Sequence, residues 1–278
     1  MLNSVSETAI ITLKSRVIES AKENGIIKDP MGKLLYESLL ENLNEDVKNR
    51  IIKRKMSSVL SAHIAIRGKK YDDYTSDFLK RNPDGLVVSL GCGFDTRYWR
   101  VGINKDNYIE LDLPEVIKTK QELLGNQLEY RTISDSILEM GWMNEVKSLK
   151  DRHVLFIAEG LLMYLPEEEV INLFKNLADN FSESEFVFEV VNKKYTKGFN
   201  KKMVEMKMKK SAGNDAGSSY NFGVVNSKEV EGYHPGLKVV EEWSYFESED
   251  LEPAILRMFG KFKTFTRTQW TMKAVING

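Results

Sequence analysis

The sequence has very few residues of the kinds that form disulfides or bind transition metals. It contains one cysteine, Cys92, and three histidines, His63, His153 and His234. A single cysteine excludes an internal disulfide and a cysteine-rich zinc site, and it fits a reducing compartment, so we expect a cytoplasmic protein. The histidines are far apart in the sequence and show no ligand spacing, so we expect no metal site.

The sequence also lacks an excess of charge and a long apolar run. Its 40 basic and 41 acidic residues leave a formal net charge of −1, which gives no electrostatic reason to expect nucleic acid or an anionic membrane as a partner. No stretch approaches the ~20 apolar residues of a membrane span. The segment Met1–Arg16 has no basic start followed by a long apolar run, so we expect no signal peptide.

Apolar residues make up 42% of the 278 residues, which is enough for a packed core. The first part of the chain reads as helical, because apolar side chains recur every three to four residues and turn residues such as Asn24-Gly25 separate the periodic segments. Helices are expected over residues 4–23, 34–43 and about 45–67. We therefore expect residues 1–84 to form a helical cap.

The pattern changes at the turn cluster Asn82–Gly85. Short apolar runs rich in β-formers then recur over residues 86–90, 108–111, 128–133, 153–158 and 186–191. Helical patterns separate several of them, the clearest over residues 166–181. This alternation predicts an α/β fold with a parallel sheet covered on both faces.

Residues 192–235 break the alternation and are expected to form a lid inserted in the core of residues 85–278. A strand over 238–246, a helix over 249–259 and a strand over 268–277 follow. A late strand with no helix after it favours an antiparallel pair at one edge of the sheet.

A glycine loop follows the first predicted strand. Gly91 and Gly93 allow a sharp turn and a close approach of the backbone to a ligand. Asp112 ends the second strand 19 residues after Gly93, near the spacing at which an acid meets ribose hydroxyls. The pair indicates a nucleoside-containing cofactor; the alternative is a tight turn with a surface Asp. Thr96 stands where a dinucleotide site has its third glycine, which weighs against a dinucleotide.

Several segments, taken in order, resemble the leucine carboxyl methyltransferases and the related polyketide O-methyltransferases. The resemblance spans nearly the whole chain, and Gly91–Arg97 is its most specific match. The other matching segments are Arg16–Ser20 with Asp29-Pro30, Arg67 with Tyr71–Asp73, Glu110–Pro114, Ser134-Asp135 with Trp142, Ala158–Leu165, Phe222-Gly223 and Pro235-Gly236.

The resemblance implies a seven-stranded, mostly parallel Rossmann-like class I methyltransferase sheet with an antiparallel last strand. It also implies S-adenosylmethionine as methyl donor and S-adenosylhomocysteine as product. Arg67 would pair with the methionine carboxylate, for which a planar cation is suited; the alternative is a helix-end surface arginine. Gly91 and Gly93 would pass under the methionine part, and Asp112 would hold the ribose hydroxyls.

Further roles follow from the same resemblance. Asp135 would accept from the adenine amino group beside the Ser136 backbone, unless it only caps a helix. Glu159 would lie near the cofactor's amino group and sulfonium, since a carboxylate directly after an apolar strand rarely lacks a partner. Cys92, Ser134 and Ser136 depart from the family's commoner residues; Cys92 is interpreted as packing.

The complete expected cofactor-binding set is Arg67, Gly91, Cys92, Gly93, Asp95, Asp112, Leu113, Ser134, Asp135, Ser136, Glu159 and Gly160. Tyr164 is the candidate catalytic residue on the acceptor side, with core packing as the alternative.

The expected reaction is direct transfer of a methyl group to an oxygen of a small molecule or of an exposed protein carboxylate. A carboxylate acceptor needs no general base, because it is ionised near neutral pH, whereas a phenol or alcohol does. The sequence marks no base strongly. The cap and the lid are expected to form the acceptor pocket.

Two other classes of function stay open at this point. A nicotinamide-dependent oxidoreductase predicts a further βαβ repeat after the fifth strand. A non-catalytic adenosyl-binding regulator predicts cofactor binding without an acceptor pocket. The oligomeric state does not follow from the sequence.

Overall fold

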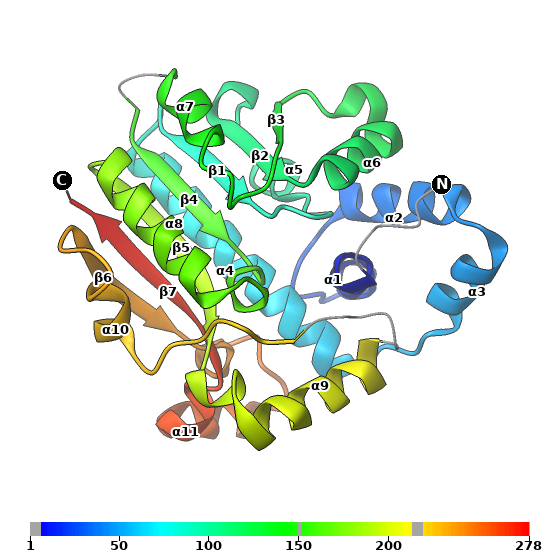
Figure 1. The fold of residues 1–278 in the computed structure, drawn as a ribbon. Coiled ribbons are helices and arrows are strands. Elements are labelled where there is room, and N and C mark those ends of the chain that lie inside the picture. Colours follow the sequence, from blue (N-terminus) through cyan, green and yellow to red (C-terminus); the bar gives the residue numbers. More distant parts are fainter. Residues whose placement is uncertain (1–6, 150–151, 213–218, 278) are drawn as a thin grey trace.

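The computed structural model describes residues 7–149, 152–212 and 219–277. Its centre is a seven-stranded sheet in the order β3-β2-β1-β4-β5-β7-β6 (Figure 1). Strands β1 to β5 pair in parallel, and β7 is antiparallel to both β5 and β6. The expected mostly parallel sheet with an antiparallel last strand is therefore confirmed. The strands are β1 (Leu86–Leu90), β2 (Tyr108–Asp112), β3 (Arg131–Ser134), β4 (Val154–Ala158), β5 (Ser184–Val191), β6 (Leu237–Trp243) and β7 (Gln269–Ile276).

Helices precede the sheet and connect its strands. The α-helices are α1 (Glu7–Ser20), α2 (Pro30–Asn42), α3 (Glu45–Lys53), α4 (Ser58–Arg81), α5 (Arg97–Val101), α6 (Pro114–Leu124), α7 (Trp142–Lys147), α8 (Glu167–Asn180), α9 (Gly198–Ala212), α10 (Ser227–Glu231) and α11 (Lys263–Thr266). Short 3₁₀ helices are η1 (Lys105–Asn107), η2 (Gly125–Gln127), η3 (Leu162–Tyr164), η4 (Lys193–Tyr195), η5 (Tyr245–Glu247) and η6 (Ala254–Lys261).

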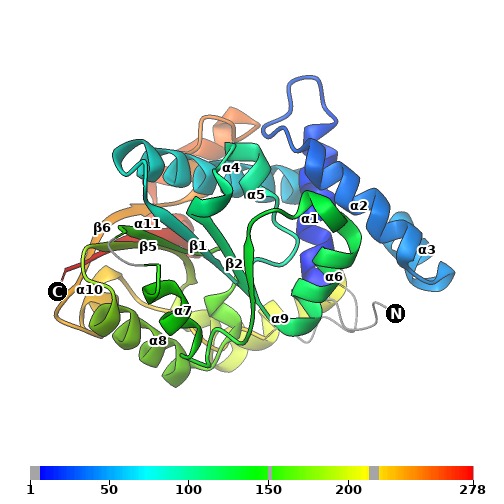
Figure 2. The ribbon, with the colours of Figure 1, turned by 90° about the horizontal axis from the view of Figure 1, so that it is seen from above.

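One layer of helices covers each face of the sheet: α4 and α5 lie on one side and α7 and α8 on the other (Figure 2). The strands supply both faces, because successive side chains of a strand point in opposite directions. Val87 and Leu155 pack in the cluster that contains Phe78 of α4. Val88 and Phe156, one residue further along each strand, pack in the cluster with apolar residues of α8.

The N-terminal helices α1 and α2 form a third apolar cluster next to the glycine loop. Leu13 of α1 and Leu35 of α2 are fully buried there. They pack with Phe94, which follows Gly93, and with Leu124 at the end of α6. The N-terminal arm is thus attached directly to the loop that was singled out as a cofactor site.

The single helix expected over residues 45–67 is wrong. The structure has α3 and α4 instead, because Ser57 caps a new helix by accepting a hydrogen bond from the backbone N–H of Leu60. Helix α4 then continues to Arg81, and its second half packs on the sheet through Tyr71, Tyr74 and Phe78. The division into a cap of residues 1–84 and a core of residues 85–278 stays a prediction.

The segment 192–235 leaves the sheet after β5 and contains α9 and α10. It returns to the sheet edge where Val224 bridges Asn192, and Lys193 forms ion pairs with Glu167 of α8 and Glu229 of α10. Of the loop expected after α9, residues 213–218 lie outside the described residues, as do residues 4–6 of the first expected helix.

The helix expected over 249–259 is displaced. The structure has the 3₁₀ helix η6 and the short helix α11 in its place. No helix within the described ranges is both long and apolar enough to cross a membrane.

Candidate functional site

The glycine loop connects β1 to α5 at the carboxyl end of the sheet. Gly91 and Gly93 have φ angles of +62° and +49°, a region that L-residues with a side chain rarely adopt. A Cβ at Gly91 would lie 2.7 Å from Cδ2 of Leu161. The Gly91 N–H donates to the backbone oxygen of Leu111 at 2.8 Å. The loop is therefore held tightly against the end of β2 and can present bare backbone to a ligand.

Asp112, the last residue of β2, faces this loop. Its carboxylate accepts hydrogen bonds from the backbone N–H of Gly93 at 2.7 Å and of Leu113 at 2.8 Å. Burial raises the pKa of Asp112, and the two backbone hydrogen bonds partly oppose that effect. The Leu113 side chain itself is 44% exposed. Between the glycines, Cys92 is buried, and burial raises the pKa of its thiol, so it remains protonated.

The end of β3 lies beside Asp112. Ser134 is opposite Asp112 in the parallel register, and the next N–H, of Asp135, donates to the Asp112 backbone oxygen at 3.0 Å. The Asp135 carboxylate accepts from the Ser136 N–H at 2.7 Å, and the Ser136 hydroxyl accepts from Leu138. The structure thus brings two acidic side chains to neighbouring strand ends, next to the glycine loop.

The carboxyl end of β4 carries the centre of the charged site. Arg67 reaches it from α4, and its Nε lies 2.9 Å from Oε1 of Glu159. Its Nη1 lies 3.0 Å from Oε2 of Glu189 on β5. Gly160, at φ +65°, leaves room for this guanidinium, since an added Cβ would lie 3.3 Å from Arg67 Nη2.

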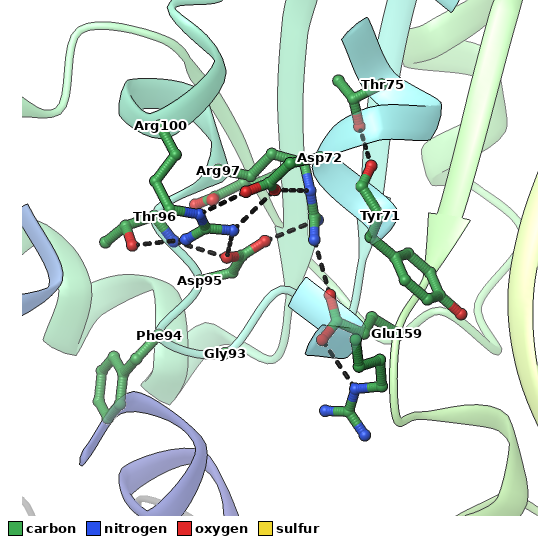
Figure 3. A network of polar contacts seen from close by, with 12 residues as sticks. Tyr71, Asp72, Thr75, Gly93, Phe94, Asp95, Thr96, Arg97, Arg100 and Glu159 are labelled. Atoms are coloured by element: carbon green, nitrogen blue, oxygen red, sulfur yellow. Dashed lines mark hydrogen bonds and ion pairs between the residues drawn. The ribbon is translucent and has the colours of Figure 1, made fainter. Parts of the chain in front are cut away.

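A second guanidinium approaches Glu159 from the other side. Arg97 Nη2 lies 2.6 Å from Oε2 of Glu159, so both carboxylate oxygens are engaged by arginines. Figure 3 shows Arg97 and Arg100 sharing two acceptors, Asp72 and Asp95, at distances of 2.6–2.9 Å. Both oxygens of Asp95 lie in these ion pairs, and its expected role in cofactor binding stays a prediction.

The same chain of contacts continues into the N-terminal arm. Arg100 Nη1 lies 3.3 Å from Asp29 Oδ2, and Arg16 Nε lies 3.0 Å from the same oxygen. Arg16 also donates to the backbone oxygen of Phe94 at 2.6 Å, while the hydroxyl of Thr96 donates to Asp29. We call the nine charged members the arginine–carboxylate network: Arg16, Arg67, Arg97, Arg100, Asp29, Asp72, Asp95, Glu159 and Glu189.

Most of this network is buried, so its charges depend on one another. Burial acts to raise the pKa of Glu159, but Arg67 and Arg97 outweigh it, and the pKa is lowered. The same balance lowers the pKa of Asp29 and of Asp95. Glu189 differs, because burial raises its pKa more than its partners lower it. Three of the carboxyl groups are therefore held ionised, and Glu189 is the one that accepts a proton most readily of these four.

On the side of the charged site that faces the segment 192–235, the polar side chains are neutral. The Tyr164 ring, in η3, is 5.7 Å from the ring of Tyr220 between centroids, and Asn221 donates to the Tyr164 backbone oxygen. Burial, with a contribution from Glu189, raises the pKa of Tyr164 to about 12. Burial and the nearby Arg67 lower the pKa of His63 to about 3, so this histidine is neutral.

Most of the expected site residues are brought together at one edge of the sheet. Sequence reasoning missed roles for Arg97 and Asp72, which were noticed only as parts of matching segments, and it did not single out Arg100 at all. It also missed Glu189. The available signal was an acidic residue inside the otherwise apolar run Phe186–Val191, because a buried charge in a strand requires a partner.

The residues present fit an adenosylated methionine. A guanidinium has five N–H donors, and in the part of the chain that the structure describes Arg67 uses two of them. The other donors can bind a carboxylate beside Gly160, where no Cβ intrudes. Asp112 and Asp135 suit hydroxyl and amino donors, and the loop has no helix-packed third glycine of the kind that serves a pyrophosphate.

Comparisons with known proteins identify the family. The family model for leucine carboxyl methyltransferase matches residues 9–178. The tetracenomycin polyketide synthesis O-methyltransferase TcmP of Streptomyces glaucescens is 26% identical over 91% of this chain and 87% of its own length. The S-adenosyl-L-methionine-dependent methyltransferase dpfgK of Gibberella zeae is also 26% identical, over 86% of this chain and 82% of its own length.

Among solved structures, an O-methyltransferase family protein from Burkholderia thailandensis aligns over 98% of this chain and 72% of its own, with 11% identity and a TM-score of 0.48. The sequence matches are what establish the family. The chain belongs to the leucine carboxyl methyltransferase family and is an S-adenosylmethionine-dependent methyltransferase.

Proposed function

We propose that this protein transfers the methyl group of S-adenosylmethionine to an oxygen atom, of a carboxylate or a hydroxyl, on a small molecule. One observation carries the proposal: Arg67 and Glu159 meet at the end of β4 beside Gly160, within reach of the glycine loop. A cation and an anion placed in this way are complementary to the carboxylate and ammonium of an amino acid.

In this proposal Arg67 holds the methionine carboxylate with its remaining donors. Glu159, fixed by two arginines, faces the ammonium group and the sulfonium. Gly91, Cys92 and Gly93 pass under the methionine part with their backbone. Because both charged side chains are held by ion pairs before any ligand arrives, little reorganisation is needed on binding.

The adenosine part is assigned to the ends of β2 and β3. Asp112 accepts from the ribose hydroxyls, and the exposed Leu113 covers one side of the sugar. Asp135 accepts from the adenine amino group next to Ser136, with Ser134 at the rim. Asp95, at the end of the glycine loop, is assigned to the same cofactor site and is held there by Arg97 and Arg100.

The acceptor is assigned to the side of Tyr164, where the lid segment 192–235 and the N-terminal helices approach the charged site. The name of the Streptomyces glaucescens relative refers to polyketide synthesis, which supports a small molecule as acceptor. An exposed protein carboxylate is the alternative of the same chemical class.

The chain's own contribution to the reaction is mainly positional. The sulfonium supplies an electrophilic methyl group when the donor is bound. The buried network fixes the donor's position, and Tyr164, Tyr220 and the lid exclude water and align the acceptor oxygen with the methyl carbon. Alignment of this kind can lower the activation free energy of methyl transfer substantially without any covalent step on the protein.

The alternative classes have less support. An oxidoreductase predicted a further βαβ repeat after β5, and the described chain has the α9–α10 segment and an antiparallel pair of strands there. A non-catalytic adenosyl-binding regulator predicts no acceptor pocket, whereas two half-buried tyrosines, Tyr164 and Tyr220, lie together on the side of the lid.

The test is a transfer assay with a labelled methyl group on S-adenosylmethionine and a panel of hydroxyl, carboxyl, amino and carbon acceptors. We expect label only in methyl esters or methyl ethers. Label exclusively on nitrogen or carbon contradicts O-methyl transfer while leaving the methyltransferase activity itself intact.

A further inference from the structure

A fully buried lysine lies beneath the glycine loop. Lys120 belongs to α6, the helix that follows β2, and its side chain is 0% exposed. A lysine is almost never fully buried unless it is paired. Its partner is Glu110 of β2, which is also 0% exposed, and the ammonium lies 2.7 Å from each of the two carboxylate oxygens. Among the described residues, neither forms an ion pair with a member of the arginine–carboxylate network.

The third donor of Lys120 connects this pair to the glycine loop. An ammonium has three N–H donors. Two of them go to the oxygens of Glu110, and one goes to the backbone oxygen of Asp95 at 2.5 Å. Asp95 closes the tight turn of the loop, because its own N–H donates to the backbone oxygen of Cys92 at 3.0 Å. Lys120 therefore holds the end of the loop that begins at Gly91.

The other contacts that hold the loop come from the same stretch of β2. The backbone oxygen of Leu111 accepts from the Gly91 N–H at 2.8 Å, and the Asp112 carboxylate accepts from the Gly93 N–H at 2.7 Å. Three consecutive residues of β2 thus act on the loop, the first of them, Glu110, through the lysine. The contact through the lysine is the one that reaches the far end of the loop, so it determines how the loop curves.

The hydrogen-bonding capacity of the pair is used up. Burial acts to lower the pKa of Lys120, but Glu110 outweighs it and the pKa is raised, so the ammonium stays protonated. The Glu110 carboxylate also accepts from the hydroxyls of Tyr130 at 3.0 Å and of Tyr108 at 3.3 Å, which fills its roughly four lone-pair positions. A ligand has no free donor or acceptor of the pair to bind, so any effect of the pair on the methyl donor passes through the loop.

We infer that Lys120 is a positioning residue for the methyl donor: held by Glu110, it fixes the Asp95 carbonyl and thereby the curvature of the glycine loop. The inference rests on the proposed placement of the methionine part over this loop. Where a glycine loop presents backbone to a ligand, it has no side chain with which to adjust the fit, so a shift of its end weakens several backbone contacts together. A buried ion pair is by itself a weak source of stability, and positioning gives this pair a role that stability does not.

The test separates positioning from stability with two variants. Glu110→Gln leaves the Lys120 side chain buried without its anion but keeps its hydrogen bond to Asp95. The double variant Lys120→Met with Glu110→Gln removes both charges together and removes that hydrogen bond as well. Loss of one partner of a buried ion pair is strongly destabilising, whereas replacement of both is often nearly neutral. We therefore expect the lower urea midpoint in Glu110→Gln and a midpoint closer to that of the wild type in the double variant.

The affinity for the methyl donor should follow the opposite order. Calorimetric titration with S-adenosylmethionine and S-adenosylhomocysteine measures it without an acceptor. We expect the double variant to bind both ligands about tenfold or more weakly than the wild type, the size of effect that a lost hydrogen bond from a charged group can have, and Glu110→Gln to lose less. Lys118→Met is the matched control, since Lys118 lies on the same helix with its side chain 76% exposed; we expect neither quantity to change.

Hydrogen exchange gives a readout that needs no ligand. In the double variant we expect faster exchange of the loop amides, Gly91 to Asp95, and unchanged exchange of the β4 amides, Val154 to Ala158. Lys120→Arg serves if the double variant does not fold. Its planar fork pairs with Glu110 through two parallel hydrogen bonds and is larger than the ammonium, so in this enclosed space it displaces the Asp95 carbonyl, and we expect the same weakening of both affinities.

Two results overturn the inference: wild-type affinity for S-adenosylmethionine in the double variant, or affinities that fall in parallel with the urea midpoints across the variants, as a purely structural role predicts. Failure of the proposed donor placement looks different, because Asp112→Ala would then also bind S-adenosylmethionine normally. Failure of O-methyl transfer appears only in the acceptor assay and leaves these binding results unchanged.

Discussion

The half of the site around β1–β4 and the half around β5–β7 are built in different ways. In the first half, Gly91, Asp135 and Glu159 directly follow their strands and Asp112 ends one. Glu159 has two arginine partners, and Asp112 and Asp135 accept hydrogen bonds from backbone N–H groups. In the second half, Glu189, Gln269, Tyr164 and Tyr220 come from segments far apart in the sequence, and most of the groups are neutral. Under the proposed function, the difference separates a preorganised donor site from an acceptor side whose chemistry depends on few residues.

The contrast also explains why an arm of helices is attached to a cofactor loop. Asp29 and Arg16, from the loop before α2 and from α1, complete the pairing of Arg100 and fix the backbone at Phe94. The charged site therefore depends on contacts made by residues of the N-terminal arm. The acceptor half has no comparable network in the described chain.

The largest expected effect comes from breaking the buried network. Arg97→Met leaves Asp72, Asp95 and Glu159 short of a cation, and removing one partner of a buried ion pair costs about 3–5 kcal/mol. Urea unfolding measures the loss. Arg81→Met is the control, since Arg81 pairs with Glu185 at the surface and its side chain is 51% exposed; we expect a change of about 0–1 kcal/mol. Equal losses in both variants would contradict the role of the network.

The next effect concerns the donor half alone. Asp112→Ala removes the acceptor of the Gly93 N–H and the proposed ribose contact. Hydrogen bonds to a charged group contribute about 1.5–3 kcal/mol, so we expect S-adenosylmethionine affinity to fall about 10- to 100-fold by calorimetry. Glu115→Ala, an exposed acid three residues further on, should leave the affinity unchanged. A similar loss in both variants would point to general electrostatics instead of a specific contact.

A smaller effect separates backbone strain from ligand contact. Gly160→Ala and Gly102→Ala each place alanine at a positive φ, of +65° and +71°, and should destabilise the fold by about 1–2 kcal/mol. Only at Gly160 does the added Cβ meet the Arg67 guanidinium, because nothing lies within 4 Å of a Cβ at Gly102. We therefore expect weakened S-adenosylmethionine binding in Gly160→Ala and normal binding in Gly102→Ala. Normal binding in both would remove Gly160 from the site.

The smallest expected effect concerns how the free energy of unfolding declines at acidic pH. Burial acts to raise the pKa of Asp29, but Arg16 and Arg100 outweigh it and the pKa is lowered. A lowered folded-state pKa stabilises the protein above the unfolded-state pKa of about 3.9, and this stability is lost as pH falls through the folded-state value. Asp29→Asn should reduce the slope of the unfolding free energy against pH by at most about 1.4 kcal/mol per pH unit. Urea unfolding at a series of acidic pH values measures this slope. An unchanged slope contradicts the assignment.

Local patterns predicted most of the sheet. The runs after residue 85 fall on β1 to β5, because buried parallel strands are continuous apolar segments. The helix expected over residues 45–67 failed at Ser57, since a capping serine in the middle of an apolar period can start a new helix. The helix predicted over residues 249–259 was displaced because the apolar spacing of this segment resembles that of a helix, whereas the chain forms the 3₁₀ helix η6 about one turn later.

Candidate site residues that stand at the end of a strand could be predicted from the sequence. Residues brought together by ion pairs between distant segments could be predicted much less well. Gly91, Gly93, Asp112 and Glu159 could be found from spacing. The partners of Arg97 could not, because Asp72 and Glu159 come from α4 and from the end of β4, far from Arg97 in the sequence. The acidic Glu189 inside an apolar run indicated a buried charge, but its place beside Glu159 follows only from the β4–β5 register.

The most direct test of the account is calorimetric titration of the wild type and Arg67→Lys with S-adenosylmethionine, S-adenosylhomocysteine and NAD. Lysine keeps the charge but loses the planar fork that serves Glu159, Glu189 and the donor carboxylate together. We predict binding of both adenosyl compounds in about the micromolar range by the wild type, none of NAD, and adenosyl affinities weakened about tenfold or more in the variant. Binding of NAD alone, or undiminished adenosyl binding by Arg67→Lys, would contradict the account.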